Sequence, residues 1–189
     1  MVLQRSRLVR LLVAIALVAL AATGLRLSDD KDNFEVVRGV LGQPVPINGG
    51  TVTASNVRVG TALVRFDKID ARTPGLFVVV QVQVAATGTK PIPSFDARVL
   101  SGHRNYKRFG LFSPGETEPG FTASVDAVFE VDPAAIDDLT LELSPVELAS
   151  GFTQHTRIHL GITPDNADEW RAAGREQQIT PTERTVRGI

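Results

Sequence analysis

Two histidines near the end of the chain are the first candidates for metal chemistry. His155 and His159 are four residues apart, with Arg157 between them. On a helix this spacing would place both imidazoles on one face, where they could share a metal ion. On the strand that the local sequence predicts, the two residues lie about 13 Å apart at a rise of roughly 3.3 Å per residue, which is too far for one ion. Arg157 would also repel a cation from that face, so we expect no metal site here.

An acidic run follows the apolar start of the chain. Asp29 and Asp30 open it, and a calcium-binding loop of this kind needs a glycine at its sixth position and an acid at its twelfth. Counted from Asp30, these two positions hold Glu35 and Leu41. The calcium pattern therefore fails, and the run is predicted to be a solvated spacer.

Recognisable catalytic motifs are missing from the sequence. It contains no G-x-S-x-G, no phosphate-binding loop, no H-E-x-x-H and no cysteine. These motifs place a nucleophile, a phosphate cradle or a metal where chemistry needs them. Asp137 and Asp138 are more simply explained as a turn than as an acid/base pair. We therefore expect no enzyme activity, no catalytic residue, no cofactor and no metal.

The densest basic region is the candidate contact surface. It is predicted to be a partner-binding patch made of Arg98, Arg104, Tyr106, Lys107 and Arg108. The partner would be an acidic envelope polymer or protein; the alternative is an ordinary solvated strand and loop. Without the three arginines of the first ten residues, the chain has 17 basic and 21 acidic residues. This acidic balance argues against a nucleic-acid partner.

The apolar segment over residues 8–27 decides where the rest of the chain is located. It has no charge from Leu11 to Leu25, and Arg5, Arg7 and Arg10 precede that run. Such a run partitions into lipid, and the arginines hold its start in the cytoplasm. The segment is slightly short for a spanning helix, and two small-x-small sites lie near its end. We expect a retained single-pass anchor with an extracytoplasmic C-terminal domain, or alternatively a cleaved signal peptide and a secreted domain.

The remaining sequence predicts one domain built from short strands. The cleanest alternation lies in Leu76–Ala85 and in Phe121–Val131, where Asp126 and Val128 are expected to point outward. A change of phase predicts a β-bulge near Ser55 and Asn56. Further strands are predicted at 34–41, 94–100, 106–112, 139–143 and 155–160. Alternating strands without long crossover helices predict an all-β, immunoglobulin-like antiparallel β-sandwich.

These elements give a linear domain plan. It consists of a basic cytoplasmic tail (1–10), a transmembrane anchor or signal peptide (8–27), a polar spacer (28–33), an immunoglobulin-like β-sandwich (34–162), and a short helix with a flexible tail (163–189). The tail is predicted to be loosely attached because it is polar.

The order of strands and turns resembles a known family. A turn and strand at 48–53 lead to the proline-glycine turn and long strand at 73–80, which ends in the Ala-Thr-Gly-Thr-Lys-Pro run at 86–91. A Glu-Pro-Gly loop at 118–120 and a strand at 128–131 follow. Over about residues 34–143 this is similar to the immunoglobulin-like (telokin-like) exported domain of unknown function in Gram-positive, especially actinobacterial, envelope proteins. The family's usual lipid-attachment cysteine is absent. The resemblance implies a secreted or tethered module and no catalytic residue.

The sequence therefore favours a binding or interaction module of the cell envelope. Its partners would be the membrane, through residues 8–27, and an envelope or membrane protein; the oligomeric state is open. The alternative is an accessory subunit of a transport or envelope-assembly complex, in which the apolar segment packs on partner helices.

Overall fold

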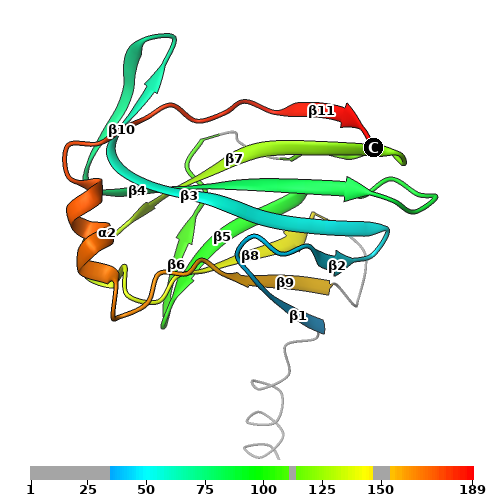
Figure 1. Cartoon of the computed structure of the whole chain (residues 1–189), viewed down its shortest axis with the longest axis horizontal. Helices are drawn as coiled ribbons and strands as arrows, with labels where there is room; N and C mark the ends of the chain where they lie inside the picture. The colour runs from blue at the N-terminus through cyan, green and yellow to red at the C-terminus, as the bar shows by residue number, and fades with distance from the viewer. Residues whose placement is uncertain (1–34, 111–113, 147–153) are drawn as a thin grey trace, which may run out of the picture. The chain divides into compact units, whose positions relative to one another are not determined.

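Two β-sheets packed face to face form the structure (Figure 1). The computed structural model describes residues 35–110, 114–146 and 154–189. Apolar side chains alternate along the strands, so each sheet buries one face against a second layer. In these ranges a single α-helix, α2 (Ala167–Gly174), accompanies the strands. The β-sandwich predicted from the sequence is confirmed.

The first sheet has five strands. Their order is β1 (Glu35–Val40), β9 (Gln154–His159), β8 (Thr140–Pro145), β5 (Phe95–Ser101) and β6 (Arg104–Lys107). β1 pairs with β9 in parallel, and the other neighbours are antiparallel. The loop between β7 and β8 contains a short 3₁₀ helix (Pro133–Ala135), whose N-cap, Asp132, accepts a hydrogen bond from the amide of Ala134.

The second sheet has six strands. Their order is β10 (Gln178–Ile179), β3 (Gly50–Arg65), β4 (Lys68–Ala86), β7 (Phe121–Val131) and β11 (Thr185–Gly188), with β2 (Val45–Ile47) also paired to β3. β10 pairs with β3 in parallel. The two parallel pairs correct the expectation of a wholly antiparallel sandwich. Two strands joined by a short hairpin must be antiparallel, whereas a long connection also allows a parallel pair. Long stretches of chain separate β1 from β9 and β3 from β10.

Alternating side chains of β4 and β7 form the core between the sheets. Val78, Val80 and Phe129 are fully buried there, in one cluster with Leu141 of β8. Burial of each such side chain stabilises the fold by about 1.5–3 kcal/mol. The two strands with the cleanest alternation in the sequence therefore supply the centre of the core.

A second apolar cluster lies on the opposite face of the six-stranded sheet. Phe77 and Val128 pack there with Leu63 and Ile179. The ring of Phe109 meets Phe77 edge to face, with 5.3 Å between ring centroids. The expectation that Val128 points into solvent is wrong. This residue is fully buried because the C-terminal segment and Phe109 cover that face.

Residues 175–189, which we call the strap, run along this sheet to its edge beside β7 (Figure 1). The sequence predicts a flexible tail here, but the strap contributes β10 and β11. Arg184 also donates hydrogen bonds to the carbonyl oxygens of Pro114 and Glu116, at 2.5 and 2.7 Å. Backbone pairing and arginine hydrogen bonds hold the strap in place. The prediction failed because a polar composition does not indicate such contacts.

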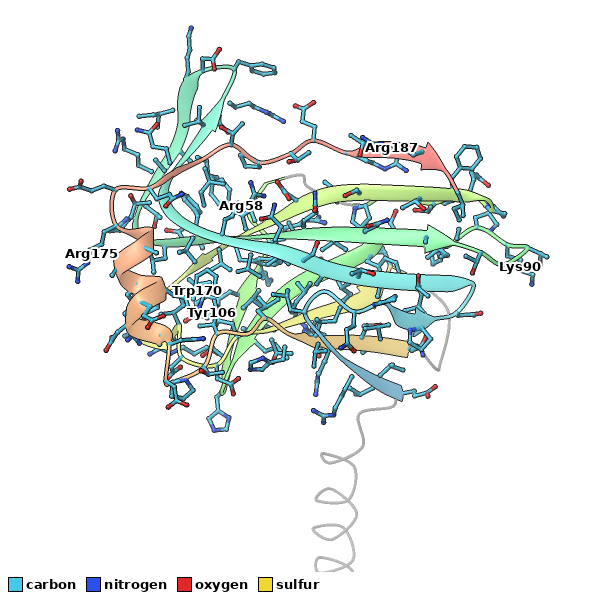
Figure 2. The ribbon with its side chains drawn as sticks, in the orientation of Figure 1. Arg58, Lys90, Tyr106, Trp170, Arg175 and Arg187 are labelled. Carbon is cyan, nitrogen blue, oxygen red and sulfur yellow. The ribbon has the colours of Figure 1, made fainter. Side chains whose placement is uncertain are left out.

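Asp126 of β7 fixes the middle of the strap. Its side chain is fully buried, and Oδ2 accepts hydrogen bonds from the amide of Thr182 and from Nη2 of Arg58, both at 2.5 Å. The Asp126 amide donates to the carbonyl of Thr182 at 3.2 Å. Figure 2 shows Arg58 on β3 close to the strap. The prediction that Asp126 points into solvent is therefore wrong, for the same reason as for Val128.

The connection between β3 and β4 also differs from the prediction. The Thr73-Pro74-Gly75 run lies inside β4, and the chain reverses at Phe66 and Asp67. Residues 62–72 thus form a two-stranded projection, which we call the arm (Figure 1). The predicted bulge near Ser55 is confirmed by a shift in the β3–β4 register. The predicted strand 106–112 is only partly correct, since β6 ends at Lys107.

No helix within the described ranges has the length and apolar character needed to span a bilayer. The predicted membrane segment, residues 8–27, lies outside those ranges.

Candidate functional site

The outward face of the five-stranded sheet contains a buried carboxylate between two arginines. Glu142 of β8 is in direct register with Arg98 of β5 on one side and Arg157 of β9 on the other. Leu141 and Leu143 point into the core, so the alternation of a strand turns Glu142 to the other face. Its side chain is nevertheless fully buried.

Each carboxylate oxygen of Glu142 has its own arginine. Nε of Arg98 donates to Oε1 at 2.6 Å, and Nε of Arg157 donates to Oε2 at 2.5 Å. The two arginine side chains remain 35% and 25% exposed. Charge-assisted hydrogen bonds of this kind are short and directional. Glu142 thus fixes the orientation of two guanidinium groups that still reach solvent.

The same register extends to both edges of the sheet. Lys107 of β6 lies opposite Arg98, and Arg38 of β1 lies opposite Arg157. Neighbouring strands are about 4.8 Å apart, so this line of five residues is roughly 20 Å long. We call it the cationic row; its members are Lys107, Arg98, Glu142, Arg157 and Arg38. Four cations and one carboxylate leave three positive charges in excess, and the exposed Asp96 of β5 opposes one of them from the same face.

The local charges shift two pKa values. Burial raises the pKa of Glu142, but the hydrogen bonds and charges of Arg157 and Arg98 outweigh this, and the net pKa is below the ordinary value. Burial lowers the pKa of His155, whose Nδ1 lies 3.5 Å from Oε1 of Glu142. The Glu142 charge opposes that shift without cancelling it. At neutral pH Glu142 is therefore ionised and His155 is uncharged.

The structure separates the five residues of the predicted patch. Arg98 and Lys107 lie side by side in the cationic row. Arg104 pairs with Asp132, outside the row. Tyr106 packs against the main core, at the end of the sandwich where α2 lies (Figure 2). Arg108 forms a backbone bridge to Phe129 of β7, and its Nε and Nη1 atoms are buried.

Sequence reasoning did not place Arg38, Glu142 and Arg157 at this surface. In the sequence Arg157 stands out only as the residue between the two histidines. In the structure His155 lies near Glu142, whereas Nε2 of His159 lies 3.3 Å from Asp138. Strand pairing carries the missing signal, because Glu142 is 44 residues from Arg98 and 15 from Arg157. Alternation shows which face of the sheet a residue occupies, but it does not identify the residue opposite it on the next strand.

Comparison with known proteins adds little to this geometry. No protein-family model matches the sequence, and no curated protein matches it. A solved structure of an uncharacterised β-sandwich protein from Clostridium difficile 630 matches 69% of this chain and 97% of its own, with 11% sequence identity and a TM-score of 0.43. The two sheets of the chain define its class, a β-sandwich protein with a cationic row across the outer face of one sheet.

Proposed function

We propose that the chain is a non-catalytic binding module of the cell envelope, and that the cationic row binds an acidic partner there. The observation that supports this is the fixed orientation of Arg98 and Arg157 by one buried carboxylate, with Arg38 and Lys107 extending the charge to both edges. Guanidinium groups held in this way suit carboxylate and phosphate groups.

The shape of the row favours an extended ligand. Four cations, spread over five adjacent strands, lie along a line of roughly 20 Å, which matches a chain of repeated acidic groups better than one small anion. A polymer with a carboxylate or phosphate in each repeat could contact several of them at once, and such binding weakens with added salt. We therefore propose an anionic envelope polymer as the partner, or the acidic surface of an envelope protein.

The proposed location depends on the N-terminal sequence. Residues 8–27 would anchor the protein in the membrane, and the spacer 28–33 would lead directly into β1, an edge strand of the sheet that carries the row. The family resemblance supports the same arrangement, an immunoglobulin-like (telokin-like) exported module. Intact mass after cell fractionation tests it. A full-length mass in the membrane pellet supports the anchor, and a shortened mass in the medium supports a secreted domain.

Binding to polyglutamate and to polyphosphate tests the function. Arg38 and Lys107 do not contact Glu142 in the hydrogen bonds described, so Arg38→Ser with Lys107→Ser lowers the charge of the row without exposing the carboxylate. Exposed ion pairs contribute up to about 1 kcal/mol each, so we expect roughly tenfold weaker binding and a smaller salt dependence.

The matched control removes two cations elsewhere. Lys90 and Arg175 are exposed and lie outside the row (Figure 2). The variant with Lys90→Ser and Arg175→Ser has the same net charge as the row variant and should bind like the wild type. Equal loss in both variants would indicate attraction by net charge alone. Unchanged binding in the row variant would exclude the proposed surface.

A further inference from the structure

The arm presents an exposed aromatic residue at its tip. Phe66 is 82% exposed, and Ile69 on the same arm is 44% exposed. Arg65 lies 5.7 Å from the centre of the Phe66 ring and forms an ion pair with Glu183 of the strap at 3.3 Å. A large apolar side chain in this position contributes nothing to either apolar cluster of the sandwich.

The backbone at the tip is unusual for these residue types. Phe66 and Asp67 have φ angles of 50° and 59°, in the left-handed region. A two-residue hairpin turn of this kind favours asparagine and glycine, and a bulky residue with positive φ is an outlier. Such outliers are most often kept where they serve a function. The turn therefore holds Phe66 outward at a conformational cost.

A pocket of about 190 Å³ lies beside the tip, between the arm and the strap. Its lining is mainly apolar and includes Leu63, Phe66 and Pro181, with Asp70 and Glu183 as acidic members. An apolar cavity of roughly 150 Å³ is large enough to hold benzene. One phenyl ring from outside would thus fit this pocket.

The geometry points to a second copy of this chain as the occupant, with Phe66 of each copy inserted into the pocket of the other. A twofold axis makes an interface reciprocal when one patch carries both the projecting group and its receptor, and the arm tip carries both. One pair of charges is also self-complementary. Lys68 follows the tip and Asp70 lines the receiving pocket, whereas Glu183 of that lining already pairs with Arg65. This inference is independent of the cationic row, which lies on the other sheet.

The contact is small, so the dimer should be weak and reversible. The arm contributes only residues 62–72 and the adjoining part of the strap, and interfaces of low area belong to transient complexes. A method that captures a short-lived contact is therefore required.

Site-specific crosslinking of the full-length protein provides the test. The chain has no cysteine, so each introduced cysteine is unique. Differently tagged copies with Lys68→Cys and Glu183→Cys are mixed and treated with a short bis-maleimide. We expect a dimer carrying both tags, and its loss when Phe66→Asp is added to both copies. Phe66→Leu, which keeps an apolar group of suitable size, should retain the dimer.

The control pair replaces Lys68→Cys with Lys90→Cys, which lies at the other end of the sandwich from the arm (Figure 2). Crosslinking of this pair at the same yield would overturn the proposal, as would a Lys68–Glu183 dimer that survives Phe66→Asp. The proposal also fails if Phe66→Leu removes the dimer while the thermal unfolding midpoint is unchanged. A crosslink from the cysteine at position 68 to a thiol of another protein, without the two-tag dimer, would overturn the second copy as the occupant and assign the arm to that protein.

Discussion

Two buried carboxylates lie on opposite outer faces of the sandwich, and their surroundings differ. Glu142 and Asp126 both have fully buried side chains and both bind arginine. Glu142 receives its hydrogen bonds from the side chains of Arg98 and Arg157, and His155 lies beside it. Asp126 binds one arginine, Arg58, and the backbone of the strap. The first arrangement leaves two partly exposed arginines on the face; the second attaches a chain segment that covers the face.

A buried carboxylate that binds arginine thus serves two structural purposes in this protein. A buried carboxylate needs hydrogen bonds and opposite charge to offset its desolvation. When neighbouring strands supply both, as around Glu142, the arginines are held in place and remain partly exposed to solvent. When the C-terminal backbone supplies part of them, as at Asp126, the same requirement holds the strap in place.

Replacing Glu142 should destabilise the whole domain. Glu142→Gln leaves Arg98 and Arg157 close together without a counter-charge, and breaking a buried ion pair typically costs 3–5 kcal/mol. Because both arginines are partly exposed, we expect about 3 kcal/mol, measured as the free energy of unfolding in urea. Asp96→Asn on the same face is the control and should change stability by less than about 0.5 kcal/mol. Equal changes in the free energy of unfolding for the two variants would show that Glu142 has no special role in stability.

Replacing Asp126 should instead act locally. In Asp126→Asn the amide oxygen can still accept hydrogen bonds, but the charge that attracts Arg58 is lost, so we expect about 1–2 kcal/mol. Hydrogen exchange should become faster in residues 178–189 while β4 and β7 remain protected. Glu183→Gln, which changes an exposed carboxylate of the strap, is the control. Uniformly faster exchange across both sheets would contradict the assigned role in holding the strap.

The core of the sandwich could be predicted from the sequence, but the covering of the outer face by the strap could not. Regular alternation in β4 and β7 identified the core, because a half-buried strand requires it. Val128 and Asp126 obey the same alternation and were assigned to solvent. Nothing local indicates that Ile179, 51 positions after Val128, and Thr182, 56 positions after Asp126, lie over them. The strap is polar, and its attachment depends on the Thr182 amide and on Arg184.

The candidate site was predicted in part for a similar reason. Arg98 and Lys107 are close in the sequence and lie together, since a hairpin joins β5 and β6. Arg38 and Arg157 come from distant segments and meet through the parallel β1–β9 pair. Tertiary packing determines how two parallel strands pair, so the register of such a pair cannot be predicted from a local sequence pattern.

The outer face around Glu142 should also respond to pH. Folding lowers the pKa of His155, so the unfolded chain binds a proton more readily and stability falls as the pH drops below about 6.5, the usual imidazole value. The depressed pKa of Glu142 acts at lower pH: its contribution is present above the ordinary glutamate pKa and is lost as the pH falls through the folded value. Unfolding measured between pH 7 and 5 should decline less steeply in His155→Gln. Parallel curves for the two proteins would exclude His155 as the cause.

The smallest effect concerns the ends of the cationic row, and its sign matters more than its size. Arg38 lies opposite Arg157, and Lys107 lies opposite Arg98, so like charges face each other on adjacent strands. Such pairs are mildly destabilising. Arg38→Ser with Lys107→Ser should therefore leave stability unchanged or raise it by a few tenths of a kcal/mol, measured by urea unfolding at low salt, and the gain should disappear at high salt. A clear loss of stability would mean that these cations serve the fold. A gain together with weaker binding to polyglutamate would mean that the protein keeps them for the partner at the expense of its own stability.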